Sequence, residues 1–309
     1  MRRSGSSGDR DVPARLRSLC LRTIAACAAG FLLLWAVFIR LEAGRRFGNS
    51  AWSGRRALAP ATRALHDDVL RTITTTSLAL ACVVLVLVGV ARRRFLLGAA
   101  AAATVAAGTA SAEVLKRFVI TRPPTPGEVA RLSGNSFPSG HATIATALAL
   151  AAIMVTPHRW RLPLAVGLSL WVSFQAAGVL AAGWHRPSDA LSGFMLALGW
   201  ASFAVWLLAF LGRVEPNRDP ATSPAATTVL FVGAASIALS GIVVAVTAGG
   251  FDLPGDATEL LIANVVIDLV GVAVVWWFWH LLRPWTLDPA RQEHDQSGHS
   301  ITGAGPVTA

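Results

Sequence analysis

A cluster of polar residues over positions 135–141 ends with the tetrapeptide Pro-Ser-Gly-His. The apolar stretch that follows predicts that Ser139 and Gly140 open a helix, whose first free backbone N–H groups bind anions. Gly140 would let this backbone approach a phosphate without a Cβ in the way, and His141 would donate a proton near neutral pH. A serine N-cap followed by an interfacial histidine is the simpler interpretation. The tetrapeptide itself is rare, since a random chain of this length contains it only about 0.002 times.

A second polar cluster, Gly-Trp-His-Arg-Pro-Ser-Asp over positions 183–189, places Asp189 four residues after His185. Pro187 suits the first position of a helix, so Asp189 would lie in the first turn of that helix, close to His185. There the carboxylate would accept a hydrogen bond from one imidazole nitrogen and leave the other nitrogen as a nucleophile or base. On its own, His-x3-Asp is weak evidence, because a chain of this length contains about one match by chance.

Cations end the apolar stretch that precedes both clusters. Lys116 is the single lysine beside 26 arginines, and its compact ammonium suits a point-charge contact with phosphate. Pro123 forces the helix to stop before Arg122, which allows Lys116 and Arg122 to converge. On one continuous helix these two side chains would point about 120° apart. A membrane-edge anchor is the better interpretation for Arg117, and Glu113 predicts an ion pair with Lys116.

Long apolar stretches separate these clusters and must position them. The chain is 54% hydrophobic and only 14% charged, with a mean hydropathy of +0.55, which excludes an ordinary soluble globule and a disordered or fibrous chain. Windows of about 19 residues predict eight membrane-spanning helices. They cover residues 23–40, 72–91, 95–115, 141–156, 162–183, 188–211, 227–249 and 259–282. We therefore expect an all-α polytopic membrane protein.

The loops between these helices predict an orientation. Basic residues at 92–94 and 158–161 mark one side as cytoplasmic, together with the basic N-terminus. Both termini are then cytoplasmic in the plasma membrane, and the three clusters open on the extracytoplasmic side. The net charge of +10 comes from arginines at the ends of apolar stretches, which favours membrane lipid headgroups as partners and not nucleic acid.

The order of three motifs resembles the three-part signature of the type-2 phosphatidic acid phosphatase superfamily. These motifs are Lys-x5-Arg-Pro, Pro-Ser-Gly-His and His-x3-Asp. The members of this superfamily include integral-membrane lipid phosphatases and soluble vanadium haloperoxidases. The resemblance covers about residues 72–211, and the first span completes the six-helix core of the family. It implies a phosphatase acting on a lipid phosphate or a polyprenyl diphosphate, without a metal or other cofactor.

The resemblance also implies a role for each motif residue. His185 would attack phosphorus and become a phosphohistidine, Asp189 would orient it, and His141 would protonate the leaving group. The phosphoryl oxygens would be held by Lys116, Arg122, Ser139 and Gly140.

Two departures from the family pattern affect the predicted phosphate site. Five residues separate the lysine and the arginine of the first motif, where the family usually has six. The third motif of the family begins with Ser-Arg, and these positions are Gly178 and Val179 here. A charge-assisted hydrogen bond contributes about 1.5–3 kcal/mol, so losing this arginine predicts a site about 10- to 150-fold weaker. Arg186 and Arg131 are the candidate replacements.

The predicted domain organisation follows from these spans. We expect a disordered basic tail over 1–18, a six-helix core over 19–211, a cytoplasmic linker over 212–226, two further membrane helices over 227–283 and a disordered tail over 284–309. The last two helices would line a lipid access path or support a homodimer. Two other functions stay open: a lipid phosphotransferase that uses the same histidine, and a non-catalytic protein that binds or moves lipids.

Overall fold

The computed structural model describes residues 8–123, 134–217, 227–228, 230–235 and 255–289. Its helices are α1 (Gly8–Trp35), α2 (Glu42–Gly54), α3 (Pro60–Arg71), α4 (Thr75–Ala91), α5 (Phe95–Val114), α6 (Gly140–Val155), α7 (His158–Ala181), α8 (Pro187–Phe210) and α10 (Gly255–Leu282). Three short turns, η1 (Ala36–Arg40), η2 (Arg55–Ala57) and η3 (Leu115–Val119), and two strands, β1 (Val214–Pro216) and β2 (Trp285–Leu287), complete the described elements. The fold is all-α apart from this strand pair.

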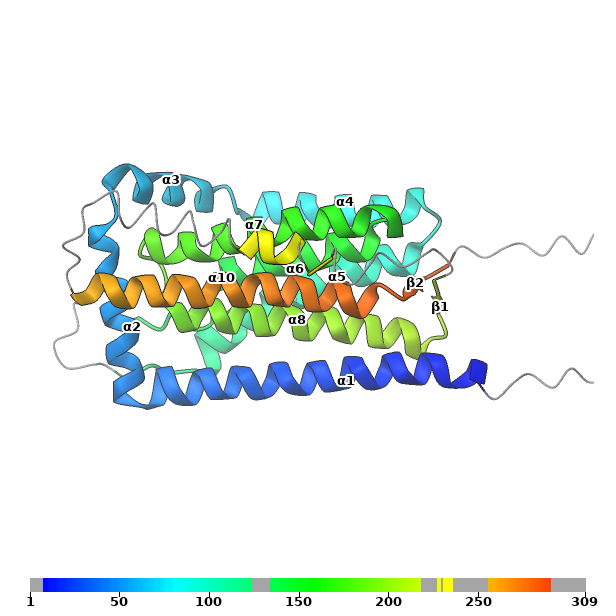
Figure 1. Ribbon diagram of the computed structural model, residues 1–309, viewed down its shortest axis with the longest axis horizontal. Coiled ribbons are helices and arrows are strands. Elements are labelled where there is room, and N and C mark those ends of the chain that lie inside the picture. The colour runs from blue at the N-terminus through cyan, green and yellow to red at the C-terminus, as the bar shows by residue number, and fades with distance from the viewer. Residues whose placement is uncertain (1–7, 124–133, 218–226, 229, 236–254, 290–309) are drawn as a thin grey trace, which may run out of the picture.

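The long helices lie side by side along one axis, and α2 crosses the bundle at one end (Figure 1). Seven of the eight predicted spans coincide with these helices, while the span predicted over 227–249 lies mostly outside the described residues. Within the described ranges, five helices are long and apolar enough to cross a membrane, and the pair α3 and α4, bent by 58°, would make a sixth. These helices support a membrane protein.

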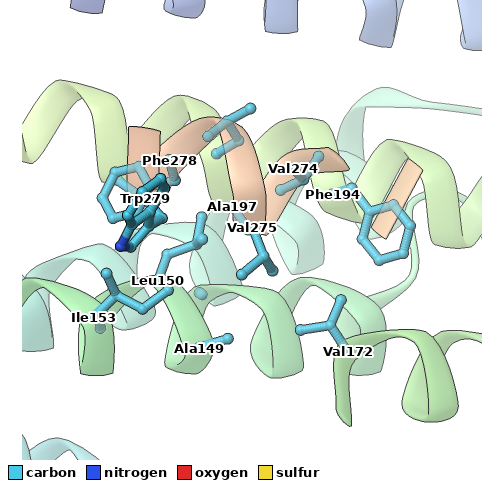
Figure 2. Packing of buried hydrophobic residues seen from close by; sticks show 14 of the residues in the cluster. Ala149, Leu150, Ile153, Val172, Phe194, Ala197, Val274, Val275, Phe278 and Trp279 are labelled. Carbon is cyan, nitrogen blue, oxygen red and sulfur yellow. The ribbon is translucent and has the colours of Figure 1, made fainter. Parts of the chain in front are cut away.

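Helix α6 is the short central element of the bundle. Its 16 residues rise about 24 Å, less than the roughly 30 Å of a hydrocarbon core. It contacts α4, α5, α7, α8 and α10, and most of its residues are buried. Figure 2 shows Leu150 and Ile153 of α6 on the side that faces Phe278 and Trp279 of α10, and all four belong to the buried core. The N-terminus of this central helix, which carries the tetrapeptide, is therefore held from several sides.

Helices α6 and α8 approach most closely near their N-terminal ends. A Cβ on Gly193 of α8 would lie 2.9 Å from the backbone nitrogen of Thr143 and 3.0 Å from the carbonyl oxygen of Ser139. Only glycine fits at this distance, as at other close helix contacts in membranes. The small residue thus allows the starts of the two helices to meet.

The segment predicted as a linker and the one predicted as a disordered C-terminal tail each contribute a strand to a short sheet, so residues 285–287 are ordered, contrary to the predicted disorder. Strands β1 and β2 pair antiparallel, with Val214 opposite Leu287. Val214, Trp285 and Leu287 are buried. The buried guanidinium of Arg161 donates hydrogen bonds to the carbonyl oxygens of Leu282 (3.2 Å) and Trp285 (2.9 Å). These long-range contacts stabilise the sheet, and no local sequence pattern indicates them.

The N-terminal prediction also changes. Helix α1 begins at Gly8, so it occupies most of the segment 1–18 that we expected to be disordered. Arginine and leucine favour helix, and Leu16 is fully buried, so packing extends the helix toward the N-terminus.

Candidate active site

The two histidines meet at the end of the bundle where α6 and α8 begin. His141 lies in the first turn of α6, and His185 lies just before α8. Their ring centroids are 6.5 Å apart, although the residues are 44 positions apart in the sequence. The two loops therefore open at the same end, as the predicted orientation requires, and both imidazoles can reach one ligand.

His185 lies beside a fully buried carboxylate. Its Nδ1 is 3.5 Å from Oδ2 of Asp189, which has no exposed side-chain surface. The contact is longer than a tight hydrogen bond, as is common in catalytic sites before the substrate binds. Because Nδ1 faces Asp189, the opposite nitrogen, Nε2, is the one left for a substrate.

Several donors surround Asp189 and stabilise its negative charge. Oδ2 accepts hydrogen bonds from the Ser136 hydroxyl and from the backbone N–H of Arg186, the latter at 3.0 Å. Oδ1 accepts from the Ser188 hydroxyl at 3.3 Å. A buried carboxylate with this many donors favours the ionised form, which can orient and charge-stabilise the neighbouring imidazole.

The Pro-Ser-Gly-His loop is fastened to the start of α8. The backbone N–H of Ser139 donates to the carbonyl oxygen of Asp189 at 2.8 Å. The Ser139 hydroxyl accepts from the backbone N–H of Ala142 at 3.3 Å, so Ser139 is the N-cap of α6. A hydroxyl that accepts one hydrogen bond can still donate its proton, so this capping contact is compatible with a bond to a phosphoryl oxygen.

Lys116 lies beside Gly140, in the first turn of α6. A Cβ on Gly140 would be 3.7 Å from Nζ of Lys116 and 3.3 Å from Oε1 of Glu113. The predicted ion pair is confirmed, with 2.6 Å between Lys116 Nζ and Glu113 Oε1. Asn135 fixes this end of the helix, because its Nδ2 donates to the carbonyl oxygens of Lys116 and Ile120. The ammonium thus adjoins the free N–H groups of α6.

Arg122 also reaches the site after the helix stops. The helical segment ends at Val119, before the proline that predicted the break. The Arg122 side chain is 2% exposed, and its Nη1 is 3.9 Å from Oδ1 of Asp189. A Cβ on Gly48 of α2 would lie 3.9 Å from Nη2 of Arg122, so α2 covers the guanidinium. Lys116 and Arg122 therefore both lie at the end of the bundle that holds the histidines.

Of the two candidate replacements for the missing arginine, Arg186 lies within this cluster and Arg131 lies outside the described residues. Arg186 is 2% exposed, its Nε donates to Oδ1 of Asn49 at 2.7 Å, and its Nη1 donates to the Ser136 hydroxyl at 3.3 Å. Val179, at the position of the missing arginine, is fully buried. Its carbonyl oxygen accepts hydrogen bonds from the backbone N–H groups of Trp184 and His185.

Removing the Arg186 guanidinium is expected to lower kcat/KM by about 10- to 150-fold, mainly through KM, because one charge-assisted contact is lost. The test compares Arg186→Met with Arg186→Lys, which keeps the charge, by steady-state phosphate release and inhibition by inorganic phosphate. Arg46→Met is the control, since that side chain is 72% exposed and pairs with Glu42 away from the histidines. An unchanged inhibition constant for phosphate in a folded Arg186→Met protein would contradict a phosphate-binding role.

Residues of α2 and α3, which lie outside the three motifs, cover the loop that precedes His185. Trp184 packs edge-on against His141, with centroids 4.9 Å apart, and its Nε1 donates to Oδ1 of Asp67 at 2.9 Å. Trp52 Nε1 donates to the carbonyl oxygen of Gly183, whose φ of +77° favours glycine. Asp67, in the His-Asp-Asp sequence at 66–68, therefore fixes the loop that precedes His185.

Among the residues described, no group of three or more His, Cys, Asp or Glu side chains could hold a metal ion. The cluster contains two imidazoles, the carboxylates of Asp189 and Glu113, and several cations. This arrangement can bind an anion, deliver a nucleophilic nitrogen and donate a proton.

The comparisons with known proteins agree with the motifs. No curated protein and no solved structure matches the chain. The family model described as the PAP2 superfamily matches residues 95–213, a segment that runs from α5 to the end of α8 and contains both histidines. That family indicates a phosphatase-like activity. Residues 95–213 are thus similar to the PAP2 superfamily, which confirms the resemblance seen in the order of the three motifs.

Proposed function

We propose that this protein is a membrane-embedded phosphatase that hydrolyses a lipid phosphate or diphosphate through a phosphohistidine. The observation that carries the proposal is the pairing of His141 and His185, 6.5 Å apart, with Asp189 behind the second imidazole. Lys116 and the N-terminus of α6 adjoin these groups and supply the charge that a phosphoryl group needs.

The first step of the proposed mechanism is phosphoryl transfer to the protein. Nε2 of His185 attacks phosphorus, forming a P–N bond while the P–O bond to the leaving group breaks. His141 gives its proton to the leaving oxygen, so the product departs as an alcohol or as a phosphate. Asp189 stabilises the positive imidazole that results.

The second step is hydrolysis of the phosphohistidine. His141, now neutral, takes a proton from a water molecule, whose oxygen attacks phosphorus. The P–N bond breaks, orthophosphate leaves, and both histidines return to their starting state. The cations and the start of α6 would hold the three phosphoryl oxygens during both steps.

We also propose which side of the membrane the candidate active site faces. The basic loops at 92–94 and 158–161 belong to the end of the bundle away from the histidines, which supports an extracytoplasmic site by the positive-inside rule. Substrate would then reach the site from the outer leaflet.

The test measures orthophosphate release by the purified protein from phosphatidate, phosphatidylglycerophosphate, and polyprenyl mono- and diphosphates. Release is expected from at least one of these, and a chelator should not reduce it. In right-side-out vesicles an impermeant phosphate ester should be hydrolysed at once, and in inverted vesicles only after detergent is added. Release that requires an added alcohol would favour the phosphotransferase, and binding without turnover would favour the non-catalytic alternative.

A further inference from the structure

An apolar groove runs between α1 and α8, along the membrane-spanning part of both helices. Its volume is about 500 Å³, within the range of small-molecule binding sites. Its lining residues include Ala28, Phe31, Leu115, Met195, Gly199 and Trp200. None of its described lining residues is charged, so a hydrocarbon would displace no polar contact with them.

The residues that face each other on the antiparallel helices α1 and α8 show which end of the groove lies nearer the histidines. Gly30 of α1 faces Met195, because a Cβ on that glycine would lie 3.2 Å from Sδ of Met195. Farther from the histidines, Gly199 faces Cys27, with 3.7 Å between its virtual Cβ and Cβ of Cys27. The lining on α8 extends from Met195 to Phe203, a rise of about 12 Å.

One end of the groove adjoins the candidate active site. Leu115 is a lining residue and directly precedes Lys116. The Phe31 ring lies 5.2 Å, between centroids, from that of Phe137, two residues before Ser139. The groove thus begins next to an ammonium and ends about 12 Å deeper among apolar side chains.

Fixed walls and small residues shape the groove. The Trp200 indole is held by a hydrogen bond from its Nε1 to the Ser111 hydroxyl of α5, at 3.0 Å. Ala28 and Gly199 leave the space between the larger side chains. At the rim, Leu32 is 59% and Phe203 is 41% exposed, so the groove is open toward the bilayer.

We propose that this groove holds the hydrocarbon chain of a lipid phosphate whose phosphoryl group lies at Lys116 and His185. The inference rests on the proposed function and adds the position of the chain. A positive charge at one end and an apolar channel at the other fit a molecule with an anionic head and a long tail. The helix α10, which we expected to line a lipid access path, contributes no residue to the described lining.

The test places a large side chain in the groove and compares it with a matched control on the same helix. Ala28 and Ala29 are both exposed on α1, but only Ala28 lines the groove. Ala28→Trp is expected to lower kcat/KM for hexadecyl phosphate at least tenfold, since each methylene group kept from burial weakens binding about fourfold. Hydrolysis of p-nitrophenyl phosphate, which has no long chain, should be unchanged, and Ala29→Trp should leave both substrates unaffected.

The outcomes separate this inference from the proposed function. If the wild-type protein hydrolyses hexadecyl phosphate and Ala28→Trp does so equally well, or if Ala28→Trp loses both substrates equally, the groove assignment is overturned and the phosphatase stands. If the wild-type protein hydrolyses neither of these substrates and none of the four lipids named under the proposed function, the proposed function fails. In that case, photo-crosslinking with a diazirine on the chain of hexadecyl phosphate still tests whether the groove binds the hydrocarbon chain. Labelling of 24–32 and 195–203 that Ala28→Trp abolishes supports it, and labelling elsewhere overturns it.

Discussion

Replacing His185 by alanine is expected to lower the rate of phosphate release by about 10⁴-fold or more, because it removes the group that bonds to phosphorus. Asp189 would remain buried with its donors, but without an imidazole to orient. The remaining cations and the start of α6 would still bind phosphate, so KM should change much less than kcat. The variant therefore separates chemistry from binding.

The measurement combines steady-state kinetics with direct detection of the intermediate. After a rapid quench of wild-type protein turning over ³²P-labelled substrate, the label should be attached to the protein and be stable to base but labile to acid. His185→Ala should carry no label. His280→Ala is the control, because His280 is an exposed histidine near the opposite end of the bundle and should leave rate and labelling unchanged. Activity of His185→Ala within tenfold of wild type would refute the assigned nucleophile.

The sequence predicted the elements of this site well, because local rules determine them. The tetrapeptide predicts a helix start at Gly140, and the structure begins α6 there with Ser139 as its N-cap. Pro187 likewise begins α8 at the predicted first position. The apolar stretches located seven helices within the described residues, of which α6 is too short to cross a membrane by itself. Each of these predictions depends only on neighbours along the chain.

The contacts that support the site could not be predicted in the same way, because they join distant parts of the chain. Ser136 donates to Asp189 across 53 positions, and Arg186 donates to Asn49 across 137. No spacing rule relates a polar residue of α2 to a cation 137 residues later. The replacement of the missing arginine was therefore left open between two candidates, and the fold places one of them among the site residues.

The ion pair of Lys116 has a consequence for how a phosphate would bind. Glu113 lies 2.6 Å from the ammonium and close to Gly140, at the position that a phosphoryl oxygen would approach. Arg117 also contacts Glu113, at 2.8 Å. An arriving phosphate would therefore compete with a carboxylate for Lys116, while Arg117 retains that carboxylate. The pair positions the lysine at a membrane edge, where an isolated cation would be costly.

His141 should be essential only where the leaving group needs a proton. His141→Ala is expected to slow cleavage of hexadecyl phosphate in a single turnover by about 10²–10⁴-fold, the usual contribution of a general acid. A p-nitrophenolate leaves without protonation, so the first burst of p-nitrophenol from p-nitrophenyl phosphate should stay within about tenfold of wild type.

The second step distinguishes proton transfer by His141 from a purely structural role. Without this imidazole no base assists the attacking water, so the phosphohistidine formed from p-nitrophenyl phosphate should accumulate in His141→Ala and be trapped by a rapid quench. The neighbouring Trp184 provides a structural control: its ring packs against His141 at 4.9 Å between centroids, and Trp184→Phe removes the bond to Asp67 while keeping an aromatic ring there. That variant should slow both substrates alike. Equal losses on both substrates in His141→Ala, with no trapped intermediate, would show that His141 positions the site and does not transfer the proton.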